Sequence, residues 1–385
     1  MIRRGSFGGP VVGPLGRAGL QWLTAGNTGG MGDGSEGAME EHLAVQFYGD
    51  PGAREALSIL QQRRPWGSNW HRSRPARTSR GSTGPSAIAL VRDGVLKVAS
   101  VNAPLEADYE IGSVSKGLTG LLYADAVDRG EVDRTTTLGD LLPLQDCEPA
   151  KVTLESISRH ASGLPRLPKS QATAGRTLAL LLHGANPYGE TLDELLVQAR
   201  TVRLQTPKPR YSNFGFELLG HAIAAGAGTT YRELMVRRIT GPLGLASLYA
   251  PASPLELRQD ALPGRSRSGR IMQPWTGEAL APAGGWRATI GDMGELARVL
   301  LQGSVPGASA LDPVSDFAGP AARIGAAWLS LGVKGRTVTM HNGATGGFRS
   351  WIGLDRKEGT AVVLLSATSA PLDRHGFRLL LNLPR

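Results

Sequence analysis

The chain lacks paired cysteines, long apolar runs and clustered histidines. Its 385 residues contain one cysteine, Cys147, so no disulfide can form within the chain. No stretch approaches the roughly 20 consecutive apolar residues that a membrane-spanning helix requires. The seven histidines show no paired spacing of metal ligands. These absences argue against a disulfide-stabilised, membrane-spanning or metal-dependent protein, and we expect neither a metal nor another cofactor.

Lysine is also scarce, although the chain is basic. The formal net charge is +9, and arginine supplies most of the positive charge. Trp66 and Trp70 lie in a stretch without acidic residues that contains Arg63, Arg64, Arg72, Arg74, Arg77 and Arg80. Such a stretch can contact nucleic acid or an anionic membrane, or it can be a solvated tether whose tryptophans dock onto the main domain. No recognised nucleic-acid motif accompanies it, so we favour the tether and expect no nucleic-acid partner.

The first 84 residues differ in composition from the rest. Gly, Ser and Arg dominate both ends of this region, and we expect a poorly ordered extension before one large domain over residues 85–385. Between these ends a helix is predicted, with Asp50 as its N-cap and Pro51 in its first turn. Arg3 and Arg4 give a loose likeness to a twin-arginine export signal, but a Gly-rich, proline-interrupted stretch follows. We expect a cytoplasmic protein, with export through an atypical signal as the alternative.

Strands are predicted at both ends of the main domain. Residues 87–91 and 95–101 are apolar runs joined through Asp93-Gly94, which predicts a β-hairpin. Near the other end, short apolar or alternating runs separated by Gly-containing turns predict strands over 324–331, 337–340, 350–354 and 361–365.

Helices dominate the middle of the domain. Apolar spacing and turn residues predict helices over 116–129, 213–225 and 231–239, a fourth from Thr289 or Asp292, and a final one over 372–381. Strands at both ends of a helical middle indicate an α+β fold. We expect an antiparallel sheet built from N- and C-terminal strands, flanked by helices, with a mainly helical lobe inserted between its strands. The cleft between sheet and lobe is the natural place for a site.

The first motif with chemical content is Ser113-Val114-Ser115-Lys116, at the start of a predicted helix. A spacing of three places both functional side chains on one helix face, so the amine can reach the hydroxyl. Free N–H groups at the helix start favour developing negative charge there, and a buried lysine of lowered pKa can remove the serine proton. The alternative is a helix cap beside a solvated lysine, because the motif alone is common.

The second motif is Tyr211-Ser212-Asn213, just before another apolar helix. A tyrosine beside an ammonium can have a lowered pKa and act as a base or a relay. Asn213 can then bind a substrate amide or hold the lysine. The alternative is a packed tyrosine with Asn213 capping the helix.

The third motif is His341-Asn342-Gly343, followed by Ala344, at the end of a predicted strand. Glycine in such a strand lets a substrate backbone approach closely. Lys357-Glu358-Gly359 fits the same pattern but falls in a predicted turn, and a single histidine at a strand end is most often structural.

The three motifs occur in the order found in the serine β-lactamase-like family, which includes class C β-lactamases, DD-carboxypeptidases, D-aminopeptidases and related esterases. The chain resembles this family from about residue 85 to 380. Further shared segments are Arg159-His160-Ala161-Ser162-Gly163-Leu164-Pro165, Gly241-Pro242-Leu243-Gly244-Leu245 and Ala283-Gly284-Gly285-Trp286. We interpret the segment at 160–163 as a structural turn of the helical lobe.

The resemblance implies a β-lactamase/transpeptidase-like fold and an acyl-enzyme mechanism. It assigns Ser113 as nucleophile, Lys116 as base and Tyr211 as second base or relay. Substrate binding is assigned to Asn213, His341, Asn342, Gly343 and Ala344. The backbone N–H groups of Ser113 and Ala344 are implied to form the oxyanion hole.

One departure bears on the substrate. Many members of the family have Lys and Thr where this chain has His341 and Asn342, and a mostly neutral imidazole anchors a carboxylate less well than an ammonium. We therefore expect a serine hydrolase acting on a small ester, amide or lactam, with ester or D-amino-acid-amide substrates favoured over antibiotics. A non-catalytic protein that binds penicillin or peptidoglycan fragments is the alternative. The oligomeric state and the physiological substrate stay open.

Overall fold

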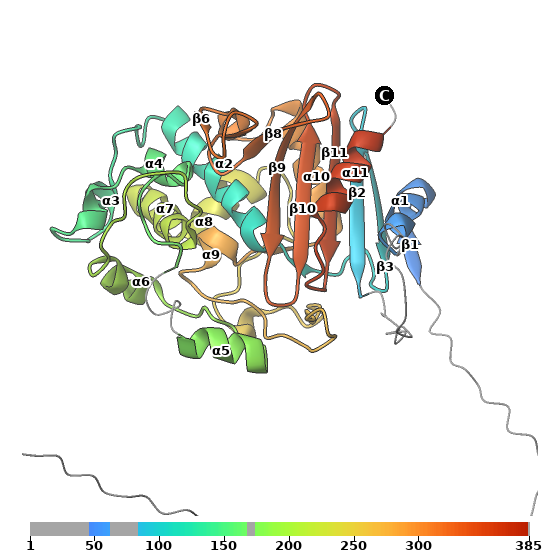
Figure 1. Cartoon of the computed structure of the whole chain (residues 1–385), viewed down its shortest axis with the longest axis horizontal. Coiled ribbons are helices and arrows are strands. Elements are labelled where there is room, and N and C mark those ends of the chain that lie inside the picture. The colour runs from blue at the N-terminus through green and yellow to red at the C-terminus, as the bar shows by residue number, and fades with distance from the viewer. Residues whose placement is uncertain (1–45, 62–83, 168–173, 384–385) are drawn as a thin grey trace, which may run out of the picture. The chain divides into compact units, whose positions relative to one another are not determined.

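The two ends of the domain meet in one antiparallel sheet. The computed structural model describes residues 46–61, 84–167 and 174–383, and Figure 1 shows their arrangement. In the described residues the strand order is β1-β3-β2-β11-β10-β9-β8-β7-β6. The bounds are β1 Phe47–Gly49, β2 Ser86–Arg92, β3 Val95–Val101, β6 Ser315–Asp316, β7 Ala322–Ile324, β8 Leu329–Val333, β9 Arg336–Ala344, β10 Arg349–Asp355 and β11 Thr360–Ser366. Strand β11 lies between β2 and β10, so the expected sheet of N- and C-terminal strands is confirmed.

The first hairpin forms where the Asp-Gly signal predicted it. Asp93 and Gly94 have φ angles of 51° and 75°. Left-handed backbone at both central positions gives a turn whose twist matches that of the two strands. Residues of β2 and β3 pair in register from Ser86↔Val101 to Arg92↔Val95.

Helices cover both faces of the sheet. On one face, α1 (Pro51–Gln61) and α11 (Asp373–Asn382) bury Leu57 and Leu380 in an apolar cluster with Trp351. On the other face, α10 (Ile290–Gln302) packs against β11, β2 and β3. Alternate residues of β2 enter the two clusters, as the two-residue period of a strand requires: Ala89 faces α10 and Ile88 faces α1.

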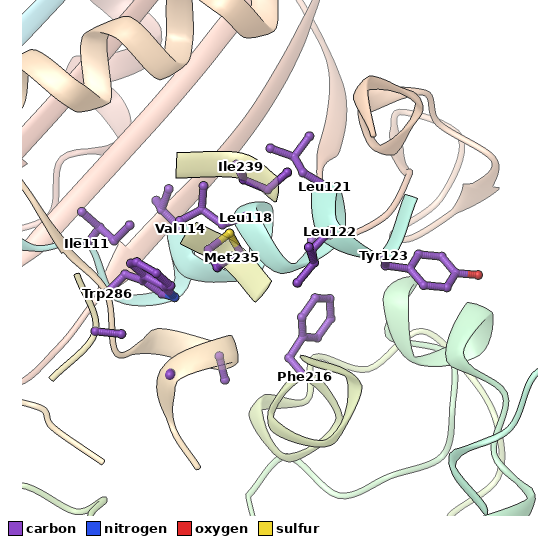
Figure 2. Close-up of a cluster of buried hydrophobic side chains, with 14 of the residues drawn as sticks. Ile111, Val114, Leu118, Leu121, Leu122, Tyr123, Phe216, Met235, Ile239 and Trp286 are labelled. Atoms are coloured by element: carbon purple, nitrogen blue, oxygen red, sulfur yellow. The ribbon is translucent and has the colours of Figure 1, made fainter. Parts of the chain in front are cut away.

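A helical lobe lies between β3 and β6 in the chain (Figure 1). Its central helix, α2 (Ser115–Asp128), is buried at every position from 115 to 126, as expected for a helix without a polar face. Figure 2 shows Leu118, Leu121 and Leu122 of α2 inside the apolar cluster, with Phe216 of α7 pointing toward it. The other elements of this region are β4 Tyr109–Glu110, η1 Gly112–Val114, α3 Leu138–Leu141, η2 Glu148–Lys151, α4 Leu154–Ser158, α5 Ala174–His183, α6 Leu192–Ala199, α7 Asn213–Gly226, α8 Tyr231–Met235, η3 Val236–Thr240, η4 Pro254–Glu256, α9 Ala281–Gly284, β5 Arg287–Ala288 and η5 Ala308–Leu311.

The predicted strand over 324–331 is wrong in one respect, because it is two strands. β7 ends at Ile324 and β8 begins at Leu329. Between them, the N–H groups of Ala326 and Ala327 bond to carbonyls outside the sheet, and Ala327 has a φ of 68°. The indole N–H of buried Trp328 donates to Gly117 O at 3.2 Å. Contacts with the lobe therefore interrupt the strand.

The expected division of the chain at 84/85 does not hold for residues 46–61. Strand β1 pairs with β3, and α1 buries Ala53 and Leu57 against the sheet. The predicted helix start is confirmed, because Asp50 Oδ1 accepts the N–H of Ala53 at 3.1 Å. The arginine-rich stretch with Trp66 and Trp70, and the N-terminal residues with Arg3 and Arg4, lie outside the described residues. Within the described ranges, no helix combines the length and apolar character needed to cross a bilayer.

Candidate active site

A cleft of about 580 Å³ opens between the lobe and strand β9. We call its two sides the lobe wall and the sheet wall. The lobe wall comprises Arg166, Leu167, Leu180, Pro187, Tyr188, Tyr211, Asn213, Trp275, Leu280, Ala283 and Gly284. The sheet wall comprises Asn342, Gly343, Ala344, Thr345, Gly346, Arg349 and Asp373. Ser113 lines the same cleft, so segments more than 200 residues apart in the chain meet where the sequence predicted a site.

Ser113 and Lys116 are in contact. Ser113 lies in the 3₁₀ turn η1, which leads directly into α2, and the Lys116 Nζ donates to Ser113 Oγ at 3.3 Å. The same Nζ donates to the carbonyl oxygen of Ala283 at 2.5 Å. Lys116 has no exposed surface, so the alternative of a solvated lysine beside a helix cap is wrong.

The Lys116 amine titrates near neutral pH. Its pKa is lowered from 10.5 to about 7, mainly by burial; the charge of Glu217 opposes the shift and that of Arg166 adds to it. A buried amine loses hydration that its charged form needs, which is the physical cause of the main effect. A substantial fraction of the amine is therefore unprotonated at pH 7, as a general base requires.

Tyr211 completes the contact around the serine. Its Oη donates to Ser113 Oγ at 2.5 Å, and the Lys116 Nζ lies 4.8 Å from its ring centroid. Burial raises the pKa of the Tyr211 phenol, although the Ser113 hydrogen bond and Arg166 oppose this. The expectation of a lowered phenol pKa is therefore wrong, because loss of hydration outweighs the nearby positive charges. Tyr211 is a protonated phenol and can donate a proton.

Asn213 faces the cleft but does not cap its helix. The N-cap of α7 is Ser212, whose Oγ accepts the N–H of Gly215 at 2.8 Å. The amide nitrogen of Asn213 instead donates to Tyr188 Oη at 2.8 Å. Its Oδ1 has no hydrogen-bond partner among the described residues. That oxygen is buried, so a substrate N–H reaches it only if neighbouring groups move.

His341 lies inside β9 rather than at its end, and it does not line the cleft among the described residues. Its Nδ1 lies 2.8 Å from the carbonyl oxygen of Asn342, and its ring packs edge-on against Trp328. Burial lowers the pKa of His341 to about 4, with Lys116 adding to the effect. The ring is neutral at pH 7 and turned into the core, so the structure gives it no direct substrate contact.

Two glycines allow η1 to lie in close contact with β9. A Cβ on Gly343 would lie 2.0 Å from Ile111 O, and a Cβ on Gly112 would lie 2.8 Å from Ala344 N. Gly112 also has a φ of 49°, which side chains disfavour. The sequence interpretation of Gly343 was a close approach by substrate. The structure shows that the protein's own backbone makes this approach.

The N–H of Ala344 points toward the cleft. Thr345 donates its N–H to Phe348 O across the hairpin at 3.1 Å. Because successive N–H groups of a strand alternate in direction, that of Ala344 points away from β10. Pairing with β8 on that side ends at Met340. The N–H groups of Ala344 and Ser113 therefore lie near each other, where η1 contacts β9.

No sequence motif marks the charged groups of the cleft. Asn342 Nδ2 donates to Asp373 Oδ1 at 2.6 Å, and Arg349 Nη1 donates to the carbonyls of Thr345 and Phe348. Arg166 lines the lobe wall. Arg166, Arg349 and Asp373 lie outside every recognised motif, and the fold brings them into the cleft. Ala283 was part of a recognised segment, but its contact with Lys116 was not foreseen.

The fold and site place this chain among known proteins. The chain belongs to the beta-lactamase family, whose model matches residues 74–383. A curated relative, the D-alanyl-D-alanine-carboxypeptidase/endopeptidase AmpH of Escherichia coli strain K12, is 27% identical over 164 residues. That match spans 42% of this chain and 41% of the relative.

Solved structures share the fold. An octameric penicillin-binding protein homologue from Pyrococcus abyssi superimposes with a TM-score of 0.67 at 20% identity, covering 78% of this chain and 74% of that chain. A class C beta lactamase from Rhodobacter sphaeroides gives 0.64 at 18% identity, with 78% and 94% covered. A beta-lactamase/D-alanine carboxypeptidase from Pseudomonas syringae gives 0.66 at 18% identity, with 79% and 94% covered. The resemblance to the β-lactamase-like family and its fold is thus confirmed.

Proposed function

We propose that this protein is a serine hydrolase that forms an acyl-enzyme on Ser113 and hydrolyses an ester, amide or lactam. The observation that carries the proposal is the pair of contacts at one oxygen. Ser113 Oγ lies 3.3 Å from the Lys116 Nζ and 2.5 Å from the Tyr211 Oη. One group can take a proton at neutral pH and the other can give one, which is what acyl transfer needs.

In the first half-reaction, the neutral Lys116 amine accepts the Ser113 hydroxyl proton as Oγ bonds to the substrate carbonyl carbon. The carbonyl oxygen becomes an oxyanion, stabilised by the N–H groups of Ser113 and Ala344. The bond from carbon to the leaving group then breaks. The leaving group takes a proton from Tyr211, and the phenol is reprotonated from the Lys116 ammonium.

In the second half-reaction, water attacks the acyl carbon. Its proton passes to the amine of Lys116, the ester bond to Ser113 breaks, and Oγ regains a proton through Tyr211. The acid product leaves and the site returns to its resting state. Asn213 lines the cleft and holds Tyr188 through its amide nitrogen.

The preferred substrates are esters or amides without a carboxylate beside the sheet wall. His341 is neutral and turned away, and Asn342 is engaged by the carboxylate of Asp373. A substrate carboxylate placed beside Asn342 meets the negative charge of Asp373 and no lysine ammonium, although the Arg349 guanidinium lies on the same wall. Much of the lobe wall is apolar, including Leu167, Leu180 and Leu280, which suits an apolar acyl or alcohol group.

Covalent labelling tests the proposal. The wild-type protein, Ser113→Ala and Ser268→Ala are incubated with a fluorophosphonate probe and with a fluorescent penicillin, and p-nitrophenyl ester hydrolysis is followed in parallel. Ser268 is an exposed serine whose hydroxyl contacts Ser266, and it serves as the matched control. We expect labelling and turnover in the wild type and in Ser268→Ala, and neither in Ser113→Ala.

Two outcomes contradict the proposal. Equal labelling of the wild type and Ser113→Ala would remove Ser113 as the nucleophile. Reversible penicillin or peptidoglycan-fragment binding, without turnover of p-nitrophenyl esters, nitrocefin or D-alanyl peptides, would instead identify a non-catalytic binding protein.

A further inference from the structure

The turn at residues 159–165, which the sequence resemblance singled out without a role, lies alongside the Tyr211 motif. Gly163 O accepts the N–H of Gln205 at 2.8 Å, and Pro165 O accepts the Ser212 hydroxyl at 2.6 Å. The carbonyl of Arg166 accepts the N–H of Asn213 at 2.9 Å. Hydrogen bonds therefore join the turn to the segment that contains Tyr211 at several points.

His160 contacts three consecutive residues of the segment that contains Tyr211. Its carbonyl oxygen accepts the N–H of Arg210 at 2.8 Å, and its Nδ1 accepts the N–H of Ser212 at 3.2 Å. Between these two bonds, its ring lies on that of Tyr211, with centroids 4.6 Å apart. The His160 ring also lies 4.7 Å from that of Phe216. The imidazole therefore packs against both the Tyr211 phenol and helix α7.

The backbone of His160 adopts a conformation that directs its ring toward Tyr211. Its φ is 55°, a left-handed conformation that is uncommon for residues other than glycine and enriched for His, Asn and Asp. The side chain is only 3% exposed. A residue held in such a conformation is maintained by its surroundings, here the bonds to Arg210 and Ser212.

We propose that His160 is a positioning residue that holds the Tyr211 hydroxyl against Ser113. The inference rests on the proposed function, because it assigns His160 a role only through the phenol that acts on Ser113. Since Nδ1 accepts the Ser212 N–H, the ring proton is on Nε2, and the ring carries no charge. Burial, Lys116 and His341 lower the pKa of His160 well below 6.5, in agreement with this assignment. A neutral ring also avoids placing a second positive charge beside the Lys116 amine.

The test is a double-mutant cycle in the full chain between His160→Ala and Tyr211→Phe. The measured quantity is the acylation rate with a p-nitrophenyl ester under single turnover. We expect His160→Ala to slow acylation by about 10- to 100-fold, because a misplaced catalytic group costs about that much. In the Tyr211→Phe background the same substitution is expected to change the rate less than about twofold, because the hydroxyl that it positions is gone.

Two further variants separate positioning from folding. Asn tolerates the left-handed backbone and offers Oδ1 near the place of Nδ1, so His160→Asn is expected to recover part of the lost rate. Ser156→Ala alters a hydroxyl of the neighbouring helix α4, which bonds to Thr153 O, and is expected to leave the rate unchanged. Melting temperatures of all variants are measured alongside.

The outcomes distinguish the two claims. If Ser113→Ala and Tyr211→Phe abolish or slow acylation while His160→Ala does not, the positioning role is wrong and the proposed function stands. Equal losses from His160→Ala in both backgrounds would show a structural effect that does not act through Tyr211, and would also overturn the inference. If Ser113→Ala itself has no effect, the proposed function fails first.

Discussion

The two walls of the cleft differ in how they are built. On the lobe wall, Tyr211 and Asn213 are held by partly buried hydrogen bonds, next to the fully buried Lys116. On the sheet wall, Asn342 is exposed and pairs with the carboxylate of Asp373, and Arg349 contacts backbone carbonyls. The lobe wall excludes water and so shifts the pKa values of Lys116 and Tyr211. The sheet wall carries polar and charged groups that solvent can reach.

The comparison separates two requirements of the proposed reaction. Proton transfer needs an amine whose pKa is near 7, and burial is the largest cause of the lowered pKa of Lys116. Recognition needs groups that a substrate can reach. Because the two requirements lie on opposite walls, we expect a sheet-wall residue such as Asn342 to be exchangeable without disturbing the contacts among Ser113, Lys116 and Tyr211.

The largest effect is expected from Lys116→Arg. A guanidinium stays protonated at neutral pH and cannot accept the Ser113 proton, so acylation should slow by about 10²- to 10⁴-fold. Single-turnover kinetics with a p-nitrophenyl ester measures this. Lys151→Arg is the control, because its side chain is 77% exposed and pairs with Asp146 away from the cleft. A Lys116→Arg rate within threefold of wild type would show that this amine is not the base.

Gly343→Ala is expected to separate the sheet wall from η1. The added Cβ would meet Ile111 O at 2.0 Å and Ser350 Oγ at 2.2 Å, so η1 must move away from β9. We expect the free energy of unfolding to fall by about 2 kcal/mol and kcat/KM to fall by about 10²-fold as the oxyanion contacts separate. Gly332→Ala, on the neighbouring strand β8 with open space around its Cβ, is the matched control. Unchanged melting and kinetics in Gly343→Ala would contradict the packing described.

The pH dependence probes the lobe wall. Because the pKa of Lys116 is lowered to about 7, the neutral amine predominates above that pH, and kcat/KM should rise with pH through a midpoint near 7. The charge of Arg166 contributes to the lowering. Arg166→Gln should therefore raise the pKa and move the midpoint to higher pH, whereas Arg210→Gln should leave it in place. A midpoint that stays fixed, or moves to lower pH, would refute the assigned coupling.

The smallest effect is expected from Asp373→Asn, which removes one negative charge from the sheet wall. Esters that carry a carboxylate should gain about threefold in kcat/KM, because an exposed charge contributes less than about 1 kcal/mol. Neutral esters of the same size should be unaffected. Asp146→Asn is the control, since its side chain is 93% exposed and lies on the lobe away from the cleft. Equal gains for neutral and carboxylate esters would rule out charge as the cause.

The sequence predicted the chemistry of the lobe wall better than that of the sheet wall. Ser113, Lys116 and Tyr211 were found because local spacing and a known order of motifs mark them. The resemblance assigned His341 to substrate binding, at the end of a strand expected over 337–340. In the structure β9 extends to Ala344 and the His341 ring is buried. Asp373 could not be foreseen, since its place depends on how α11 packs against β10.

Some fold features also needed tertiary information. The Asp93-Gly94 hairpin and the buried helices followed from local sequence signals. The break between β7 and β8 did not, because it results from Trp328 and its neighbours bonding to the lobe. Strand β1 was missed because three residues carry too little pattern to separate them from the Gly- and Arg-rich sequence around them.

The place of β11 between β2 and β10 has a consequence for biosynthesis. A nascent chain carries Ser113 and Lys116 well before the ribosome has made residues 360–366, which pair with residues 86–92. The centre of the sheet cannot close on any shorter translation product, and contacts over such sequence distances form slowly. Chains that end before residue 360 therefore carry Ser113 without the completed sheet around it, and we expect the proposed hydrolysis only after β11 has been made.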